Sequence, residues 1–295
     1  MKYLEVRRKS NKEQLEVLES EQSDFFSVQS YQIKRKKEKE EEWAGYEFLL
    51  TITNAHYTIC DYIAMKTMKI MLHPAISIKE VSRECSSKQA DAVSSDQQKH
   101  SIFECFLGFF AKNISSIVKF AKQIPGFLEF SLQDQRILLK SNYFGIWMLY
   151  MSRTIKLLPK SLTFSDGSYF TKQQLEIMYD FEMVCLLFES ISLLTRLRLN
   201  DDEFGLFSAL LLFKPDKADI IDEDAAKMYY MKLCKALEIQ IKINHGDKYD
   251  KFTRLMNGIH QLQILHTKHD EIIQKFGRNK EESSKYEAII KESFE

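Results

Sequence analysis

Two histidines, His266 and His269, lie three positions apart in a segment with helical periodicity, so they would share one face of a helix. Imidazole pairs of this kind bind zinc when further ligands complete the coordination sphere. No third ligand occurs at a suitable spacing, so we interpret the pair as surface or pocket histidines. The sequence also has no G-x-S-x-G, P-loop or G-x-G-x-x-G motif. The chain is therefore predicted to hold no metal or cofactor and not to be an enzyme.

Composition limits the classes of protein that remain possible. The 42 basic and 42 acidic residues cancel, so no overall field favours nucleic acid. Hydrophobic residues make up 44% of the chain, and only nine Gly and four Pro favour long helices over an all-β fold. The five scattered cysteines contain no C-x-x-C pair, as expected of reduced thiols in a cytosolic or nuclear protein. No apolar run reaches the ~18 residues of a membrane span, and no signal peptide follows Met1.

A stretch near the middle of the chain has the signals of a helix end, a tight turn and a new helix start. Lys122 places a cation in the last turn of one helix. Pro125 cannot continue that helix, and Gly126 supplies the freedom that a sharp turn needs. Ser131 is the expected N-cap of the next helix, with Asp134 as an acid in its first turn. The sequence thus predicts two helices that meet at an angle.

Apolar residues recur at helical spacing through most of the chain, which predicts an all-α fold. A turn at Asp166–Gly167 between β-prone residues predicts one hairpin over Leu162–Phe170. The polar residues 84–100 are predicted to form a mobile loop. Helices are predicted at about 43–63, 101–123, 132–153, 171–178, 181–198, 202–213, 251–276 and 286–294. A further helix is predicted to end at residue 243 and to start at either Asp222 or Asp224.

The chain is predicted to have one helical domain, residues 41–295, after a charged segment at residues 1–40. Lys34–Lys37 is a basic run that is followed by acidic residues. Such a run is typical either of a nuclear localisation signal or of a solvated, disordered linker, and both interpretations stay open.

Two motifs carry a resemblance to a known family. Phe120–Phe127 has the pattern FAK-x-φ-P-G-F, and Asp134–Lys140 has the pattern DQ-x-x-LLK. Both motifs, at this spacing, closely resemble the signature of nuclear hormone receptor ligand-binding domains, and the resemblance extends from about Trp43 to the end. Leu199–Glu203 and Ala236–His245 look most like the peroxisome-proliferator-activated and thyroid-hormone receptor group.

The resemblance implies a three-layer antiparallel helical sandwich with a small β-hairpin, an internal lipophilic pocket and a terminal helix that docks in the active state. Its function would be that of a ligand-regulated transcription factor domain in the nucleus, which recruits coactivators or corepressors through Leu-x-x-Leu-Leu helices. Such a helix would lie in an apolar groove, with Glu292 at its N-terminus and Lys122 at its C-terminus. The groove residues that the resemblance implies are Val118, Lys122, Leu132, Gln135, Arg136, Leu139, Lys140, Ile289 and Glu292.

The implied pocket is rich in aromatic side chains. Its residues are Phe103, Phe106, Leu107, Phe110, Ile114, Phe144, Met148, Met183, Leu187, Leu265, His269 and Phe294. The four polar groups that hold a fatty-acid carboxylate in the peroxisome-proliferator type map to Phe110, Phe144, His269 and Phe294. Since three of these are phenylalanines, a carboxylate would be costly to bury there. A smaller and drier pocket is expected, with His269 as its main polar contact.

Association with a second receptor is also implied. The apolar stripe of the segment 251–276 is wider than core packing needs, which predicts a dimer surface for a retinoid X receptor. That surface comprises Phe252, Leu255, Met256, Ile259 and Leu262. Gly145 and Lys214 stand where dimerising receptors have a salt bridge, which weakens this prediction. Arg136, where the family has an apolar groove residue, would either extend outwards or alter the choice of partner.

Two alternatives remain at this point. The pocket could be filled by its own aromatic side chains, which would make the chain a ligand-independent scaffold that acts by dimerisation or corepressor binding. The chain has no zinc-finger pattern. It is therefore expected not to bind DNA itself, either as a fragment of a longer protein or as a receptor that acts without DNA.

Overall fold

The computed structural model describes residues 45–72, 76–77, 95–157, 160–214, 219–246, 249–276, 288 and 291. Leu49–Glu295 forms one compact unit, and Met1–Phe48 forms another, of which only residues 45–48 are described. The predicted linker 1–40 and the boundary that follows it lie outside the described residues. Of the predicted terminal helix, only Ala288 and Lys291 are described, and both are helical.

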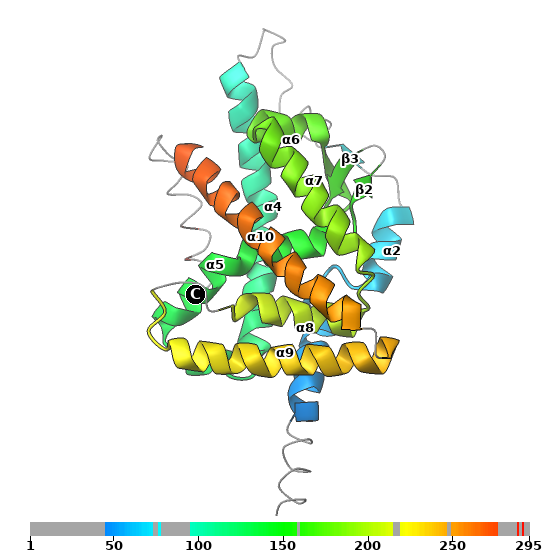
Figure 1. The fold of residues 1–295 in the computed structure, drawn as a ribbon. Helices are drawn as coiled ribbons and strands as arrows, with labels where there is room; N and C mark the ends of the chain where they lie inside the picture. The colour runs from blue at the N-terminus through cyan, green and yellow to red at the C-terminus, as the bar shows by residue number, and fades with distance from the viewer. Residues whose placement is uncertain are drawn as a thin grey trace, which may run out of the picture. The chain divides into compact units, whose positions relative to one another are not determined.

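Helices dominate the described residues, and four short strands accompany them (Figure 1). The first helical segment is 45–59. The further helices are α2 (Ala64–Leu72), α4 (Ser95–Gln123), the 3-10 helix η1 (Phe127–Glu129), α5 (Leu132–Met151), α6 (Lys172–Met178), α7 (Phe181–Arg196), α8 (Asp201–Leu212), α9 (Glu223–His245) and α10 (Tyr249–Phe276). The strands are β1 (Ile76–Ser77), β2 (Lys156–Leu157), β3 (Lys160–Thr163) and β4 (Ser168–Thr171).

Side-chain caps explain where several helices begin. The hydroxyl of Ser131 accepts the backbone N–H of Asp134 at 3.0 Å, as predicted for the start of α5. Asp222 caps α9 in the same way, through the N–H of Ala225. Two boundaries were predicted wrongly. Helix α4 begins at Ser95 and not at residue 101, so the polar residues 95–100 extend the helix instead of forming a loop. The first helix ends at residue 59 and not at residue 63, and the unpredicted α2 follows it.

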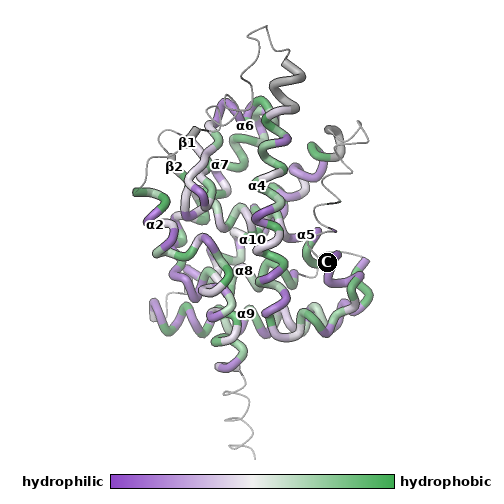
Figure 2. Tube along the Cα trace, turned by 180° about the vertical axis from the view of Figure 1, so that it is seen from behind, coloured by the Kyte–Doolittle hydropathy of each residue, from purple (hydrophilic) through white to green (hydrophobic). Residues whose placement is uncertain are grey.

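The compact unit is a three-layer helical sandwich, which confirms the predicted fold class. Helix α5 lies in the middle, where it packs against α4 on one side and against α7 and α10 on the other. Helix α8 shares the middle layer with α5, and α9 runs along α8 (Figure 1). In Figure 2, α9 alternates between hydrophobic and hydrophilic residues, as expected of a helix with one buried face.

The predicted hairpin is confirmed. Strands β3 and β4 pair antiparallel, with Leu162 opposite Phe170, and the turn Phe164–Gly167 is closed by the N–H of Gly167, which donates to the carbonyl of Phe164 at 3.0 Å. Gly167 has a φ of 88°, which explains the glycine at this position. The sheet is larger than predicted, since β1 pairs with β4 and β2 pairs with β3.

The turn after α4 is held by contacts that are distant in sequence. Gly126 has a φ of 91°, and a side chain there would overlap the ring of Tyr229. The hydroxyl of Tyr229 donates to Glu129 at 2.8 Å. Asp134 is buried and accepts the backbone N–H of Ile221 at 2.8 Å, which anchors the loop before α9. The turn between α4 and α5 therefore also contacts α9 and the loop before it.

Helix α4 is buried in spite of a composition that would suit a membrane. By length and composition its segment Ser101–Gln123 could cross a bilayer, which the sequence analysis did not expect. Half of this segment is buried within the domain, including Phe103, Phe106 and Phe110. A core helix has the same composition, and its neighbours α5 and α6 cover this one.

The first helical segment is anchored by a buried histidine, His56. Its ring lies 6.1 Å from that of Phe120 and 5.5 Å from that of Phe204. Gly205 permits this approach, since a Cβ on Gly205 would lie 2.8 Å from the Cβ of His56. Neither ring nitrogen has a hydrogen-bond partner among the described residues. Burial lowers the pKa of His56 to about 4, and the positive charge of Arg153 adds to this.

We expect this histidine to make the domain sensitive to acid. Because the pKa is lower in the folded protein than in the unfolded chain, acidification below about pH 6.5 favours unfolding, until the pH reaches about 4. When the pH falls from about 7.5 to about 5.5, His56 should lower the free energy of unfolding by about 1 kcal/mol. Urea unfolding of wild type and His56→Leu at both pH values measures it. The variant should lose less stability on acidification, and equal losses would contradict the prediction.

Candidate functional site

Five residues of the predicted pocket, all aromatic, lie together in the core, on α4, α5 and α10: Phe103, Phe106, Phe110, Phe144 and His269. Phe106 is central: its ring centroid lies 6.0 Å from that of Phe110, 5.3 Å from that of Trp147 and 6.2 Å from that of His269. We call the following residues the aromatic cluster: Phe103, Phe106, Phe110, Tyr143, Phe144, Trp147, Phe164, Tyr179 and His269.

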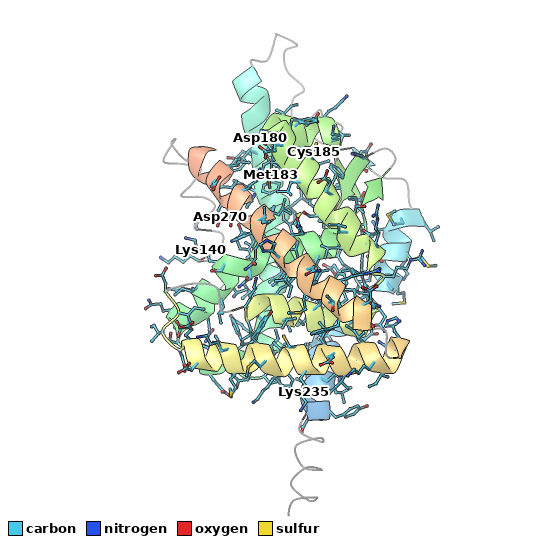
Figure 3. The ribbon with its side chains drawn as sticks, viewed as in Figure 1. Lys140, Asp180, Met183, Cys185, Lys235 and Asp270 are labelled. Carbon is cyan, nitrogen blue, oxygen red and sulfur yellow. The ribbon has the colours of Figure 1, made fainter. Side chains whose placement is uncertain are left out.

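The predicted pocket residues that the structure describes are all buried. Phe294 lies outside the described residues. Those with less than 5% of their surface exposed are Phe103, Phe106, Leu107, Phe110, Ile114, Phe144, Met148, Met183, Leu187, Leu265 and His269. Figure 3 places Met183 on α7, beside α10. The sequence therefore identified buried residues on four different helices, α4, α5, α7 and α10.

His269 is the most polar member of the cluster. Its ring stacks on Phe144 with the centroids 3.8 Å apart, and its Nδ1 lies 2.9 Å from the hydroxyl of Tyr179. Burial lowers the pKa of His269 well below its usual value, and the nearby His266 lowers it further. His269 is therefore neutral near pH 7, so it offers a hydrogen bond but no charge to a bound molecule. The pairing with Tyr179 was not predicted, because the two residues lie 90 positions apart.

The second histidine of the pair, His266, contacts other residues than His269 does. His266 Nε2 lies 3.3 Å from Asp270 Oδ2, and the ring of His266 packs against that of Tyr143. Among the described residues no group of three or more His, Cys, Asp and Glu is placed to hold a metal ion. The two histidines instead take different roles, one inside the cluster and one at its edge.

The predicted groove residues divide into a buried and an exposed set. Val118, Gln135 and Leu139 are buried, and the amide of Gln135 donates to the carbonyl of Phe130 at 2.8 Å. Lys122 is half-buried. Leu132, Arg136 and Lys140 are exposed at intervals of four residues along one face of α5, and Lys140 projects from that helix in Figure 3. Ile289 and Glu292 lie outside the described residues.

Leu128 is a further exposed leucine that was not predicted. It lies in η1, four positions before Leu132, with 61% of its surface exposed against 67% for Leu132. Exposed apolar side chains that form a contiguous patch mark interaction sites. In chain order the exposed residues are thus apolar first, Leu128 and Leu132, and then basic, Arg136 and Lys140. We call these four residues, one from η1 and three from α5, the α5 face.

The predicted dimer surface needs correction. Leu255, Ile259 and Leu262 have at most 2% of their surface exposed, because α10 packs against α7 and α5. They belong to the core and cannot form a surface. Phe252 and Met256 are half-buried and remain accessible. A second apolar stripe, which was not predicted, lies on the exposed side of α9 and is formed by Met228, Met231, Ile239 and Ile243.

Comparisons with known proteins agree with this arrangement. The family model described as the ligand-binding domain of nuclear hormone receptor matches residues 93–277, which include α4 to α10. Ecdysone-induced protein 78C of Drosophila melanogaster is 32% identical over 200 residues, which cover 68% of this chain and 22% of that protein. Nuclear receptor subfamily 1 group D member 2 of Rattus norvegicus is 29% identical over 192 residues, which cover 65% of this chain and 33% of that protein. The chain thus spans a third or less of each relative.

Proposed function

Because this chain belongs to the nuclear hormone receptor family through its ligand-binding domain, we propose that it binds a small lipophilic molecule and recruits coregulator proteins. The protein would act as a regulator of transcription in the nucleus and not as an enzyme. The single observation that carries the proposal is the aromatic cluster, which joins α4, α5 and α10 at the buried centre of the matched region.

The ligand half of the proposal is supported by the chemistry of the cluster. Its nine members present ring faces and edges, and none is an acidic or basic side chain other than the neutral His269. Aromatic rings bind apolar and aromatic molecules through large contact areas. A carboxylate would lose its hydration without gaining a cation, so a fatty acid held at these positions is disfavoured.

The coregulator half is supported by the α5 face. The exposed Leu128 and Leu132 can pack against the leucines of a Leu-x-x-Leu-Leu helix. Lys122, at the end of α4, would interact with the negative C-terminal end of that helix's dipole. Glu292, outside the described residues, is proposed to bind the opposite end.

Removing the cation should weaken the binding of such a peptide. We expect Lys122→Ala to cost about 1 kcal/mol, which is the scale of a charge at a helix terminus. Glu292→Ala should cost about 1–3 kcal/mol, since a charge-assisted hydrogen bond is lost. Fluorescence polarisation with a labelled Leu-x-x-Leu-Leu peptide measures both. Lys235→Ala is the matched control, because Lys235 is exposed on α9, away from α5 (Figure 3). If Lys122→Ala and Glu292→Ala both bind the peptide as tightly as wild type, these two charges do not hold the ends of the peptide helix.

Two finer assignments are part of the proposal. The first is a heterodimer with a retinoid X receptor, for which Phe252 and Met256 remain as accessible residues of the predicted stripe. The second is membership of the peroxisome-proliferator-activated and thyroid-hormone receptor group, which rests on the segment Ala236–His245. DNA binding is not assigned to this chain.

A further inference from the structure

Trp147 is the largest side chain of the aromatic cluster, and other rings surround it. It has 1% of its surface exposed. Its ring centroid lies 5.3 Å from that of Phe106, 5.9 Å from those of Phe110 and Phe144, and 6.1 Å from that of Phe164. These neighbours come from α4, from α5 and from the start of the hairpin turn. Trp147 therefore lies where three parts of the fold meet.

The indole N–H of Trp147 has no hydrogen-bond partner among the described residues. An indole nitrogen can only donate, and buried tryptophans normally find an acceptor. The four phenylalanine rings around Trp147 provide none. A buried donor without an acceptor destabilises the folded state, so a molecule that brings an acceptor gains more here than at an exposed site.

The other polar groups in contact with Phe106 are already engaged. The hydroxyl of Tyr179 and Nδ1 of His269 lie 2.9 Å apart and satisfy each other. Phe106 touches both of these rings and also touches Trp147. A molecule that packed against Phe106 and accepted the N–H of Trp147 would therefore leave the pair of Tyr179 and His269 intact.

We propose that the ligand of this domain is an uncharged aromatic molecule with a carbonyl or ether oxygen, which accepts the N–H of Trp147. This inference rests on the proposed function, since it names the chemical class of the lipophile. The ring contacts account for the aromatic part of the ligand. The unpartnered donor accounts for the single acceptor, and the lack of a cationic member in the cluster accounts for the neutral charge.

Fluorenone and fluorene form a suitable pair of probes, because they have nearly the same flat shape and only fluorenone carries a carbonyl oxygen. Calorimetric titration of the domain should show fluorenone to bind about tenfold tighter than fluorene. The indole N–H signal of Trp147 in an ¹⁵N-labelled sample should shift downfield with fluorenone and much less with fluorene. The chain has two tryptophans, so Trp147→Phe assigns the signal.

A variant that loses only the N–H provides the decisive comparison. Benzothienylalanine at position 147 keeps the shape of tryptophan and replaces the N–H with sulfur. In this variant the two probes should bind equally well. A preference for fluorenone that persists in the variant, or no preference in the wild type, would overturn the inference and leave lipophile binding intact. If neither probe binds the wild type, the inference fails together with the ligand half of the proposed function.

Discussion

Replacing Phe110 with alanine is expected to lower the free energy of unfolding by about 3–5 kcal/mol. Phe110 is fully buried, and its ring packs against those of Phe106, Tyr143 and Trp147 at 5.0 to 6.0 Å. Interiors are packed as densely as organic crystals, so the missing ring leaves a cavity that the neighbours fill only in part. Urea unfolding of wild type and variant measures the loss.

A lipophile should recover part of this stability, because it binds the native state alone. Ligand at a hundredfold excess over its dissociation constant adds about 2.7 kcal/mol. The matched control is Phe181→Ala on α7, where 67% of the phenylalanine is exposed, and its cost should stay within about 0.5 kcal/mol. If Phe110→Ala is as stable as wild type and takes up no lipophile, Phe110 does not line a ligand site.

The second large effect is expected at a buried charge cluster between α8, α9 and α10. The carboxylate of Glu203 is fully buried and lies 2.9 Å from Lys251 Nζ and 2.6 Å from His245 Nε2. Asn244 donates to the same carboxylate at 3.1 Å. We expect Lys251→Met to cost about 3–5 kcal/mol, because it leaves a buried carboxylate without its main cation. The exposed pair of Lys227 and Glu223 on α9 provides the control, and Lys227→Met should cost far less than Lys251→Met, because solvent screens an exposed ion pair.

The pH dependence of this effect has a defined sign. Burial by itself raises the pKa of Glu203, but the hydrogen bonds from Lys251 and Asn244 and the charge of Lys251 outweigh it, so the pKa is lowered. In the wild type, the ionised Glu203 therefore stabilises the fold, and this stabilisation is lost as the pH falls through the lowered pKa. Without Lys251 burial dominates, and the carboxyl becomes protonated more easily. The difference between wild type and Lys251→Met should shrink on acidification, and a difference that grows would contradict this role of Lys251.

The sequence by itself determined the local features of this protein. Pro125 and Gly126 predicted the turn, Ser131 the start of α5, and Asp166–Gly167 the hairpin, because each acts on the backbone within a few residues of itself. The helical spacing of apolar residues predicted most of the helices. The two motifs around the turn were sufficient to recognise the family, which the comparisons confirmed.

Only the tertiary structure decided what each apolar face meets. The periodicity of α10 shows that Leu255, Ile259 and Leu262 face something apolar, and packing against α7 and α5 supplies it within the same chain. The contacts of His269 with Tyr179 and of Glu203 with Lys251 join residues that are 90 and 48 positions apart. Helical periodicity reports which side of a segment is buried. It carries no information on which distant segment covers that side, because the packing of all the helices together decides this.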